Sequence, residues 1–419
     1  MLPNFDPLLQ TYAELVLNIG LNLRQGQRLV IIGLRTDGVP LEAAPFVRQL
    51  AAAAYKSGAR LVDVYWGDQQ IRLDRFRYAP RDSFAEYPHG RADALLQYID
   101  NGDAVITVSA PIPGLLSEQD PAVLATAEKT IQMENRSFTG QIMRDATNWC
   151  VVTAAVPAWA SVLFPDDTPD AALDHLWDTL FRICRVYEPD PVTAWRKHLQ
   201  RLAARAQYLN DRRFAALRFR GPGTDLTVGL PDDHLWRSGG GHSGSGIDFV
   251  ANVPTEEVYT MPHRGQVEGV VRATMALSYS GDLIDDFDLE FAHGRVVGLR
   301  AGKGEATLRN LVGMDEGAGC LGEVALVPHS SPIAQTGLLF YNTLLDENAA
   351  SHLALGRSYK TNLIDGAGLS DEACWQAGAN TSLVHVDFMI GSAEINVDGI
   401  TPGGTTEPIM RKGEWSITL

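Results

Sequence analysis

The first half of the chain alternates between helical and buried-strand patterns of hydrophobic residues. Between Leu8 and Leu23 the apolar positions recur at helical spacing, and Gly26 separates them from a short apolar run at Leu29–Ile32. The same order then repeats, with the following segments expected as helices (41–55, 95–99) and strands (61–65, 104–108, 150–154). Short apolar runs between amphipathic helices are typical of a parallel sheet covered on both faces. These patterns predict an α/β fold with a mostly parallel sheet.

The pattern changes in the second half of the chain. Helical patterns at 171–184 and 191–209 lead to a Gly-Pro-Gly turn at 221–223, after which the chain alternates as strands do, with a hairpin signal at His293-Gly294. We therefore predict an N-terminal α/β domain over residues 1–212 and a mixed α+β C-terminal domain over residues 213–419. Glycine clusters at 239–241 and 244–246 lack the lysine and the spacing of phosphate-binding motifs, so we expect a flexible loop there.

Length, charge and cysteine content narrow the class of protein. A chain of 419 residues favours two domains, and a net charge of −16 disfavours nucleic acid as a partner, because phosphate binding needs clustered basic residues. The cysteines are widely spaced, as expected for free thiols in a reducing compartment. We find neither a basic, apolar leader pattern nor about 18 consecutive apolar residues. We expect a cytoplasmic protein with no membrane partner.

Side chains able to bind metals are concentrated in segments of the second half of the chain. In the apolar segment around His385-Val386-Asp387, a period of two places His385 and Asp387 on one face of a buried strand. An unpaired carboxylate there would be costly to desolvate. Either a cation between the two side chains or a salt-bridge network would remove that cost.

Further candidates lie beside apolar sequence in the same half. Glu323 opens a strongly apolar strand, and a solvated strand end is its alternative interpretation. Glu256 and Glu257 are adjacent, so in extended backbone they point to opposite sides and cannot both bind one ion in the same way. His352 is followed seven residues later by Tyr359, which would share its face if a helix ran through both. Carboxylate and imidazole groups without cysteine favour a hydrolytic zinc, cobalt or manganese site.

At these residues the chain resembles the thermophilic metallo-aminopeptidase family, of the aminopeptidase T, aminopeptidase S and PepS type. The matching segments follow in order along the chain: 251–260, 315–318, 321–328, 342–349 and 385–391. The likeness extends into the N-terminal half through segments 12–15 and 208–210, and so covers nearly the whole chain. The resemblance implies a homodimer that acts on peptides with a free N-terminus, with a C-terminal catalytic domain that binds two divalent metal ions, zinc, cobalt or manganese.

Carried over residue by residue, the resemblance implies a bridged pair of ions. One ion would be held by Glu257, Glu323 and His352. The other would be held by Glu323, His385 and Asp387, so that Glu323 bridges the two. Tyr359 matches a tyrosine near the metals, and Glu347 matches an acidic residue close to the site, where it would bind substrate. The resemblance leaves open which of Glu256 and Glu257 is the ligand. The family's spacing to the bridging glutamate favours Glu257, which leaves Glu256 to act as the general base.

The implied reaction is the release of N-terminal amino acids by attack of a water that bridges the two ions. Glu256 would move the proton and Tyr359 would stabilise the oxyanion. One alternative is a mononuclear non-haem iron dioxygenase that cleaves aromatic rings on a related fold, and another is a binding protein that has lost catalysis. Metal content and oxygen dependence separate the dioxygenase from the hydrolase, and the presence of Glu256 disfavours a non-catalytic protein.

Overall fold

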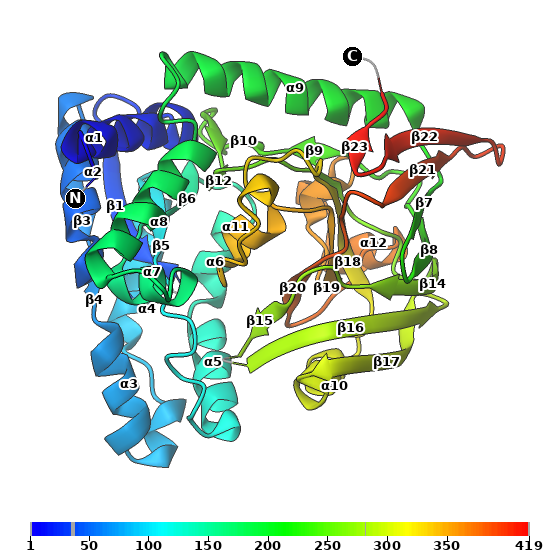
Figure 1. Cartoon of the computed structure of the whole chain (residues 1–419), viewed down its shortest axis with the longest axis horizontal. Helices are drawn as coiled ribbons and strands as arrows, with labels where there is room; N and C mark the ends of the chain where they lie inside the picture. The colour runs from blue at the N-terminus through cyan, green and yellow to red at the C-terminus, as the bar shows by residue number, and fades with distance from the viewer. Residues whose placement is uncertain (1, 35–37, 281, 418–419) are drawn as a thin grey trace. The chain divides into compact units, whose positions relative to one another are not determined.

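The computed structural model describes residues 2–34, 38–280 and 282–417 (Figure 1). Contacts within the chain divide it into two compact units. Unit 1 comprises Met1–Lys197 and Gly240–Pro254, and unit 2 comprises His198–Gly239 and Thr255–Leu419. Helix α9 (Pro191–Arg212) is continuous across the change from one unit to the other. The domain boundary that we expect after residue 212 stays a prediction.

Unit 1 contains the predicted parallel sheet. Its strands follow the order β12 (Asn252–Val253), β6 (Trp149–Thr153), β5 (Ala104–Ser109), β1 (Arg28–Gly33) and β3 (Leu61–Val64). Neighbouring strands in this order pair in parallel. The central strands β1 and β5 are almost fully buried, as their continuous apolar sequences predict. The prediction of a mostly parallel sheet in the first half of the chain is confirmed.

The helices of unit 1 precede, follow or lie between these strands in the sequence. They are α1 (Phe5–Leu15), the π-helical turn η1 (Val16–Leu21), η3 (Leu41–Ala43), α2 (Ala44–Lys56), α3 (Gln69–Tyr78), η4 (Arg81–Ala85), α4 (His89–Asp100), α5 (Pro121–Glu134), α6 (Arg136–Ile142), α7 (Pro157–Leu163) and α8 (Pro169–Ile183). The short strands β2 (Val39–Pro40) and β4 (Trp66–Gly67) pair with each other in parallel. Within the described ranges, no helix is both long enough and apolar enough to cross a bilayer.

The glycine-rich segment is more ordered than we expected. Strand β10 (Gly240–His242) pairs with β11 (Asp248–Val250), and β12 then joins the parallel sheet. A Cβ atom at Gly241 would lie 2.5 Å from the ring of Phe249, so the ring can pack over Gly241 only because this residue has no side chain. The expectation of a flexible loop at residues 240–242 is therefore wrong.

Unit 2 contains a large antiparallel sheet. Its strands follow the order β15 (Leu277–Tyr279), β16 (Asp282–Ala292), β14 (Val267–Arg272), β8 (Thr224–Gly229), β7 (Ala216–Gly221), β21 (Asn396–Ile400), β22 (Thr406–Arg411) and β23 (Glu414–Trp415), with β17 (Arg295–Lys303) paired to β16. The predicted turn at 221–223 joins β7 to β8, and His293-Gly294 joins β16 to β17. His293 and Gly294 have positive φ angles of 51° and 79°, as tight hairpins require.

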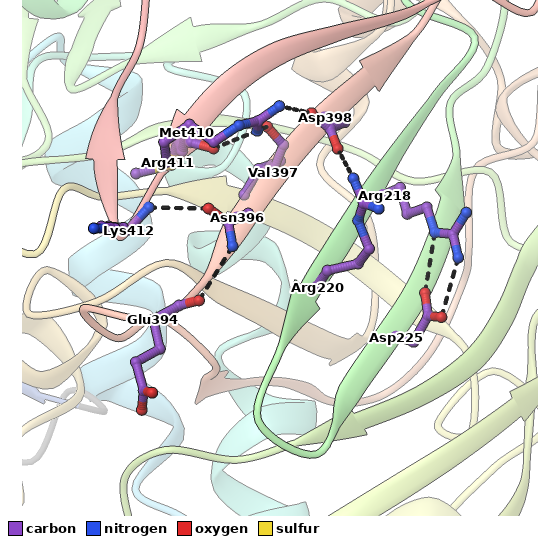
Figure 2. Close-up of polar contacts among 10 residues, drawn as sticks. All are labelled: Arg218, Arg220, Asp225, Glu394, Asn396, Val397, Asp398, Met410, Arg411 and Lys412. Carbon is purple, nitrogen blue, oxygen red and sulfur yellow. Dashed lines mark hydrogen bonds and ion pairs between the residues drawn. The ribbon is translucent and has the colours of Figure 1, made fainter.

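A buried carboxylate ties together strands of this sheet (Figure 2). Asp398 on β21 is fully buried and accepts hydrogen bonds from Arg220 on β7 and Arg411 on β22. Nearby, the exposed Asp225 on β8 accepts two hydrogen bonds of 3.0 Å from Arg218. The same sheet thus carries a buried carboxylate between two arginines and, at Asp225, an exposed carboxylate–arginine pair.

A smaller antiparallel sheet of unit 2 carries most of the candidate metal ligands. Its order is β20 (His385–Met389), β19 (His352–Gly356), β18 (Leu321–Leu326), β13 (Val258–Thr260) and β9 (Arg237–Ser238). The short helices of unit 2 are α10 (Glu305–Val312), η5 (Ala334–Thr336), α11 (Thr343–Glu347), η6 (Lys360–Asn362), η7 (Gly366–Gly368) and α12 (Asp371–Gln376). The predicted fold class is confirmed, with a parallel sheet in the first half and antiparallel sheets in the second.

Candidate metal centre

The two faces of the β18–β19–β20 sheet differ sharply in chemistry. On one face, Val324, Leu353 and Phe388 belong to the hydrophobic core of unit 2. On each strand, the residues directly before and after these three point to the opposite face, because side chains alternate along a strand. That face carries Glu323 on β18, with histidine and aspartate side chains on β19 and β20. The core face fixes the strands, and the other face presents the acidic and imidazole groups.

The strand register leaves room between these groups. Glu323 pairs with Ala354 across β18 and β19, and Ala354 pairs with Asp387 across β19 and β20. His352 is two positions from Ala354 on the same strand and opposite Ala325. Alanine at the central positions keeps the space above the sheet clear of large side chains. Small residues therefore lie where an ion between the surrounding ligands would need room.

The structure brings the predicted ligands together in two overlapping groups. The ligand atoms of each group lie within 4.8 Å of one another, and the groups are Glu257, Glu323, His352 and Glu323, His385, Asp387. His352 Nε2 lies 3.3 Å from Glu257 Oε2 and 3.5 Å from Glu323 Oε1. His385 Nε2 lies 3.6 Å from Glu323 Oε2 and 3.5 Å from Asp387 Oδ1. The two oxygens of Glu323 thus face two different imidazoles.

Backbone carbonyls orient both imidazole rings. His352 Nδ1 lies 3.1 Å from the carbonyl oxygen of Ala350, and His385 Nδ1 lies 2.7 Å from that of Arg357. Because a carbonyl only accepts, Nδ1 carries the proton in each ring and donates it. Nε2 is then the atom that can offer a lone pair to a metal, which is the arrangement that metal-binding histidines adopt.

The side chains present fit divalent cations. Asp387 Oδ1 is buried and makes no hydrogen bond to any described residue. Glu257, Glu323 and Asp387 are all less than a tenth exposed, and so many carboxylates cannot be buried together without positive charge. Oxygen and nitrogen donors without sulfur suit the metals of hydrolytic sites. A cation in each group would neutralise the carboxylates and satisfy the orphaned oxygen.

The ionisable groups of the site perturb one another strongly. Burial raises the pKa of Glu323. Burial alone would lower the pKa of His385, but Asp387 and Glu323 outweigh it and raise that pKa to about 9. Burial would raise the pKa of Asp387, but the charge of His385 holds it below the usual value. Because metal ligation requires neutral imidazole, binding of an ion here has to displace protons.

Two further predicted residues lie at this site. The partly buried Tyr359 follows β19, and its ring centroid lies 4.8 Å from that of His385. Burial and then the carboxylates of Glu323 and Asp387 raise the pKa of its hydroxyl well above the usual value, so Tyr359 is held as a neutral donor. Glu347, at the end of α11, has its pKa raised well above the usual value by burial and by Asp387 and its neighbours. The carboxylates of the ligand groups contribute to both shifts, so cations bound there would oppose the shift of Glu347 and favour its ionised form.

His352 and Tyr359 do not share a helix face, because the condition for that arrangement is not met. No helix runs through His352 and Tyr359, because residues 352–356 form strand β19 and Tyr359 follows in extended backbone. The apolar sequence after His352 pairs with strands on both sides, and this burial decides its conformation. The two side chains still reach one site because the sheet, and not a helix face, brings them together.

Glu256 belongs to neither ligand group. It is buried, and its Oε2 lies 3.5 Å from Nε2 of His198 on α9. Its backbone N–H donates a 2.7 Å hydrogen bond to Oδ1 of Asn348. Sequence reasoning missed both neighbours. A lone histidine within a polar helix carries no signal, although Asn348 lies in one of the segments that resemble the aminopeptidase family.

Comparison with known proteins gives consistent matches over the whole chain. The model of the thermophilic metalloprotease family (M29) matches residues 5–415. The chain is 46% identical over 411 residues to aminopeptidase 2 of Geobacillus stearothermophilus, with 98% of each chain covered. It is 43% identical over 413 residues to aminopeptidase T of Thermus thermophilus, with 99% of each chain covered. The solved structure of wild-type AmpT from Thermus thermophilus superposes with a TM-score of 0.92 at 42% identity, covering 99% of this chain and 100% of that one.

Proposed function

This chain belongs to the thermophilic metalloprotease family M29, and from that premise we propose that it is a two-metal aminopeptidase. The resemblance to the aminopeptidase T, aminopeptidase S and PepS type is confirmed. Membership also confirms a metal-dependent peptidase, a hydrolase that uses a divalent metal. The alternative of a ring-cleaving iron dioxygenase is not supported, because the matching family and relatives are peptidases.

The observation that carries the two-metal proposal is the position of Glu323. Its two carboxylate oxygens lie 3.5 Å from His352 Nε2 and 3.6 Å from His385 Nε2, as a bridging ligand requires. In this proposal Glu257 and His352 complete the first ion's ligands, and His385 and Asp387 complete the second's. Zinc, cobalt and manganese all suit this donor set.

The remaining residues have distinct roles in the proposed reaction. Divalent ions held by these residues would supply Lewis acidity and lower the pKa of a bound water toward neutrality. Glu256 accepts the proton of the attacking water and returns it to the leaving amine. Tyr359 donates a hydrogen bond to the oxygen of the scissile carbonyl, and Glu347 accepts hydrogen bonds from the substrate's α-ammonium group. Recognition of that ammonium limits cleavage to the N-terminal residue.

Replacement of His385 or Asp387 by alanine tests the proposal. Each variant should remain folded by circular dichroism and lose release of the aniline from leucyl-p-nitroanilide. Wild-type protein should leave N-acetyl-leucyl-p-nitroanilide intact, because the acetyl group removes the ammonium that Glu347 binds. Full activity in either alanine variant would refute the ligand assignment, and cleavage of the acetylated substrate would refute an aminopeptidase.

The proposal also covers the oligomeric state and the cellular compartment of the protein. We propose a cytoplasmic homodimer, as the family resemblance implies. The buried free thiols of Cys150, Cys184, Cys320 and Cys374 support a reducing compartment. Light scattering of the protein as it elutes from a size-exclusion column should give the mass of two 45.6 kDa chains, and a monomer mass would contradict the dimer.

A further inference from the structure

His198 lies beside the proposed general base. Its ring is on α9, and both its side chain and that of Glu256 are 5% exposed. His198 Nε2 lies 2.8 Å from the carbonyl oxygen of Thr255 and 3.5 Å from Glu256 Oε2. Since a carbonyl oxygen only accepts hydrogen bonds, Nε2 must carry the proton. The N–H of His198 therefore donates to the peptide before Glu256, and the same ring nitrogen lies within ion-pair distance of the Glu256 carboxylate.

Asn348 fixes the main chain at the same place. Its side chain is fully buried, and its Oδ1 accepts a 2.7 Å hydrogen bond from the N–H of Glu256. Its Nδ2 donates to the carbonyl oxygen of Leu344 at 2.9 Å and lies 3.4 Å from Glu347 Oε1. The backbone of Glu256 is thus anchored to α11, the helix that ends in Glu347. With the backbone fixed, the direction of the carboxylate depends on the contacts of the Glu256 side chain.

The imidazole N–H of His198 has a hydrogen-bond acceptor without Glu256. A buried imidazole N–H is already paired by the carbonyl of Thr255. The Glu256 carboxylate gains from the contact, because each polar neighbour reduces the cost of burying a charged group. A side chain with several rotatable bonds also loses its precise placement without such contacts, and a general base works only within hydrogen-bond reach of its proton.

We propose that His198 is a positioning residue that holds the carboxylate of Glu256 in the orientation from which it acts as the general base. This inference rests on the proposed function. His198 is a member of neither ligand group, so its removal should leave the metal ions in place. Its effect should fall on the chemical step, kcat, and not on substrate binding.

The test compares His198→Ala and His198→Gln with a matched control, His234→Ala. His234 is also a buried histidine of unit 2, and its Nδ1 lies 2.7 Å from the carbonyl oxygen of Pro231. The quantities to measure are metal content, melting temperature, kcat and KM for leucyl-p-nitroanilide at pH 7.5. For His198→Ala we expect kcat to fall about tenfold or more, since a positioned base contributes 10²–10⁴-fold, with unchanged metal content and KM.

The conservative variant gives the readout that a merely structural histidine would not. The glutamine amide can donate a hydrogen bond as Nε2 does, so His198→Gln should recover part of the lost kcat. The control His234→Ala should keep the wild-type kcat even if its melting temperature falls. Wild-type kcat in folded, metal-loaded His198→Ala would overturn the proposal, as would a loss of kcat that merely follows loss of metal.

A fourth variant separates this inference from the function on which it rests. Glu256→Gln should be inactive if Glu256 is the base. Inactive Glu256→Gln together with fully active His198→Ala would refute the role of His198 alone. Fully active Glu256→Gln would refute the base and, with it, the role of His198.

Discussion

Glu323 and Asp387 face each other across a single alanine, because each pairs with Ala354 from the strand on its own side. The small Ala354 side chain keeps open the space in which the proposed ions would lie. We predict that Ala354→Leu removes bound metal and activity although every proposed ligand is intact, because the added methyl groups occupy that space. Metal content measured by mass spectrometry checks this, and Ala354→Gly should keep its metal. Full metal content in a folded Ala354→Leu protein would contradict the proposed location of the ions.

Glu347 should govern substrate affinity. Replacing Glu347 by glutamine removes the negative charge proposed to bind the α-ammonium group while keeping the side-chain shape. A charge-assisted hydrogen bond contributes about 1.5–3 kcal/mol, so KM for leucyl-p-nitroanilide should rise roughly tenfold to a hundredfold. The control Glu316→Gln removes an exposed carboxylate of the same unit, 82% exposed, and should leave KM unchanged. An unchanged KM in Glu347→Gln would remove Glu347 from substrate recognition.

The buried Asp398 and the exposed Asp225 offer a matched pair for measuring stability. The Asp398 side chain is 1% exposed and contacts two arginines, whereas that of Asp225 is 64% exposed (Figure 2). Arg220 and Arg411 are about half exposed, and Asp398→Ala removes their charge-assisted hydrogen bonds to a buried carboxylate, so it should lower the free energy of unfolding by about 1.5–3 kcal/mol. Urea denaturation should detect little change in Asp225→Ala, because exposed pairs contribute little. Equal effects of the two substitutions would contradict this difference.

The pH dependence of stability should contain a contribution from His234. Its Nδ1 donates to Pro231, its Nε2 is buried without a hydrogen-bond partner among the described residues, and burial lowers its pKa below 6.5. As pH falls below 6.5, the unfolded chain binds a proton here that the folded chain does not, so folding stability falls. In wild-type protein this loss is at most about 1.4 kcal/mol per pH unit.

His234→Gln provides the comparison for that measurement. The glutamine does not titrate, so the difference in unfolding free energy between wild type and variant should be constant well above pH 6.5 and change as the pH falls through 6.5. Urea denaturation between pH 5 and pH 8 in steps of about half a unit measures this difference. A difference that stays constant throughout would show that His234 does not titrate differently on folding.

The sequence predicted the parts of the fold in which local pattern and burial agree. The apolar runs of β1 and β5 and the His293-Gly294 hairpin are confirmed, because continuous burial and positive φ each have a clear residue signature. Helix α3 was not predicted. Its sequence, Gln69–Tyr78, is largely polar, with Leu73 as its buried residue, and so has no apolar stripe.

Part of the candidate site could also be predicted from the sequence, for a different reason. The period of two that places His385 and Asp387 on one face follows from strand geometry, and the two side chains lie 3.5 Å apart. Pairing of Glu323 with Ala354 depends on strand register between segments distant in the sequence, and no local pattern encodes that register. His198 was missed because its contact with Glu256 joins a helix to a segment 58 positions later.

The central claim is that Glu257, Glu323, His352, His385 and Asp387 hold two ions with Glu323 between them. Anomalous diffraction from crystals of protein loaded with zinc or cobalt, collected on both sides of the metal's absorption edge, tests it most directly. We predict two peaks per chain, roughly 3.5–4 Å apart, on either side of the Glu323 carboxylate. A single peak, or peaks away from these side chains, would contradict the account.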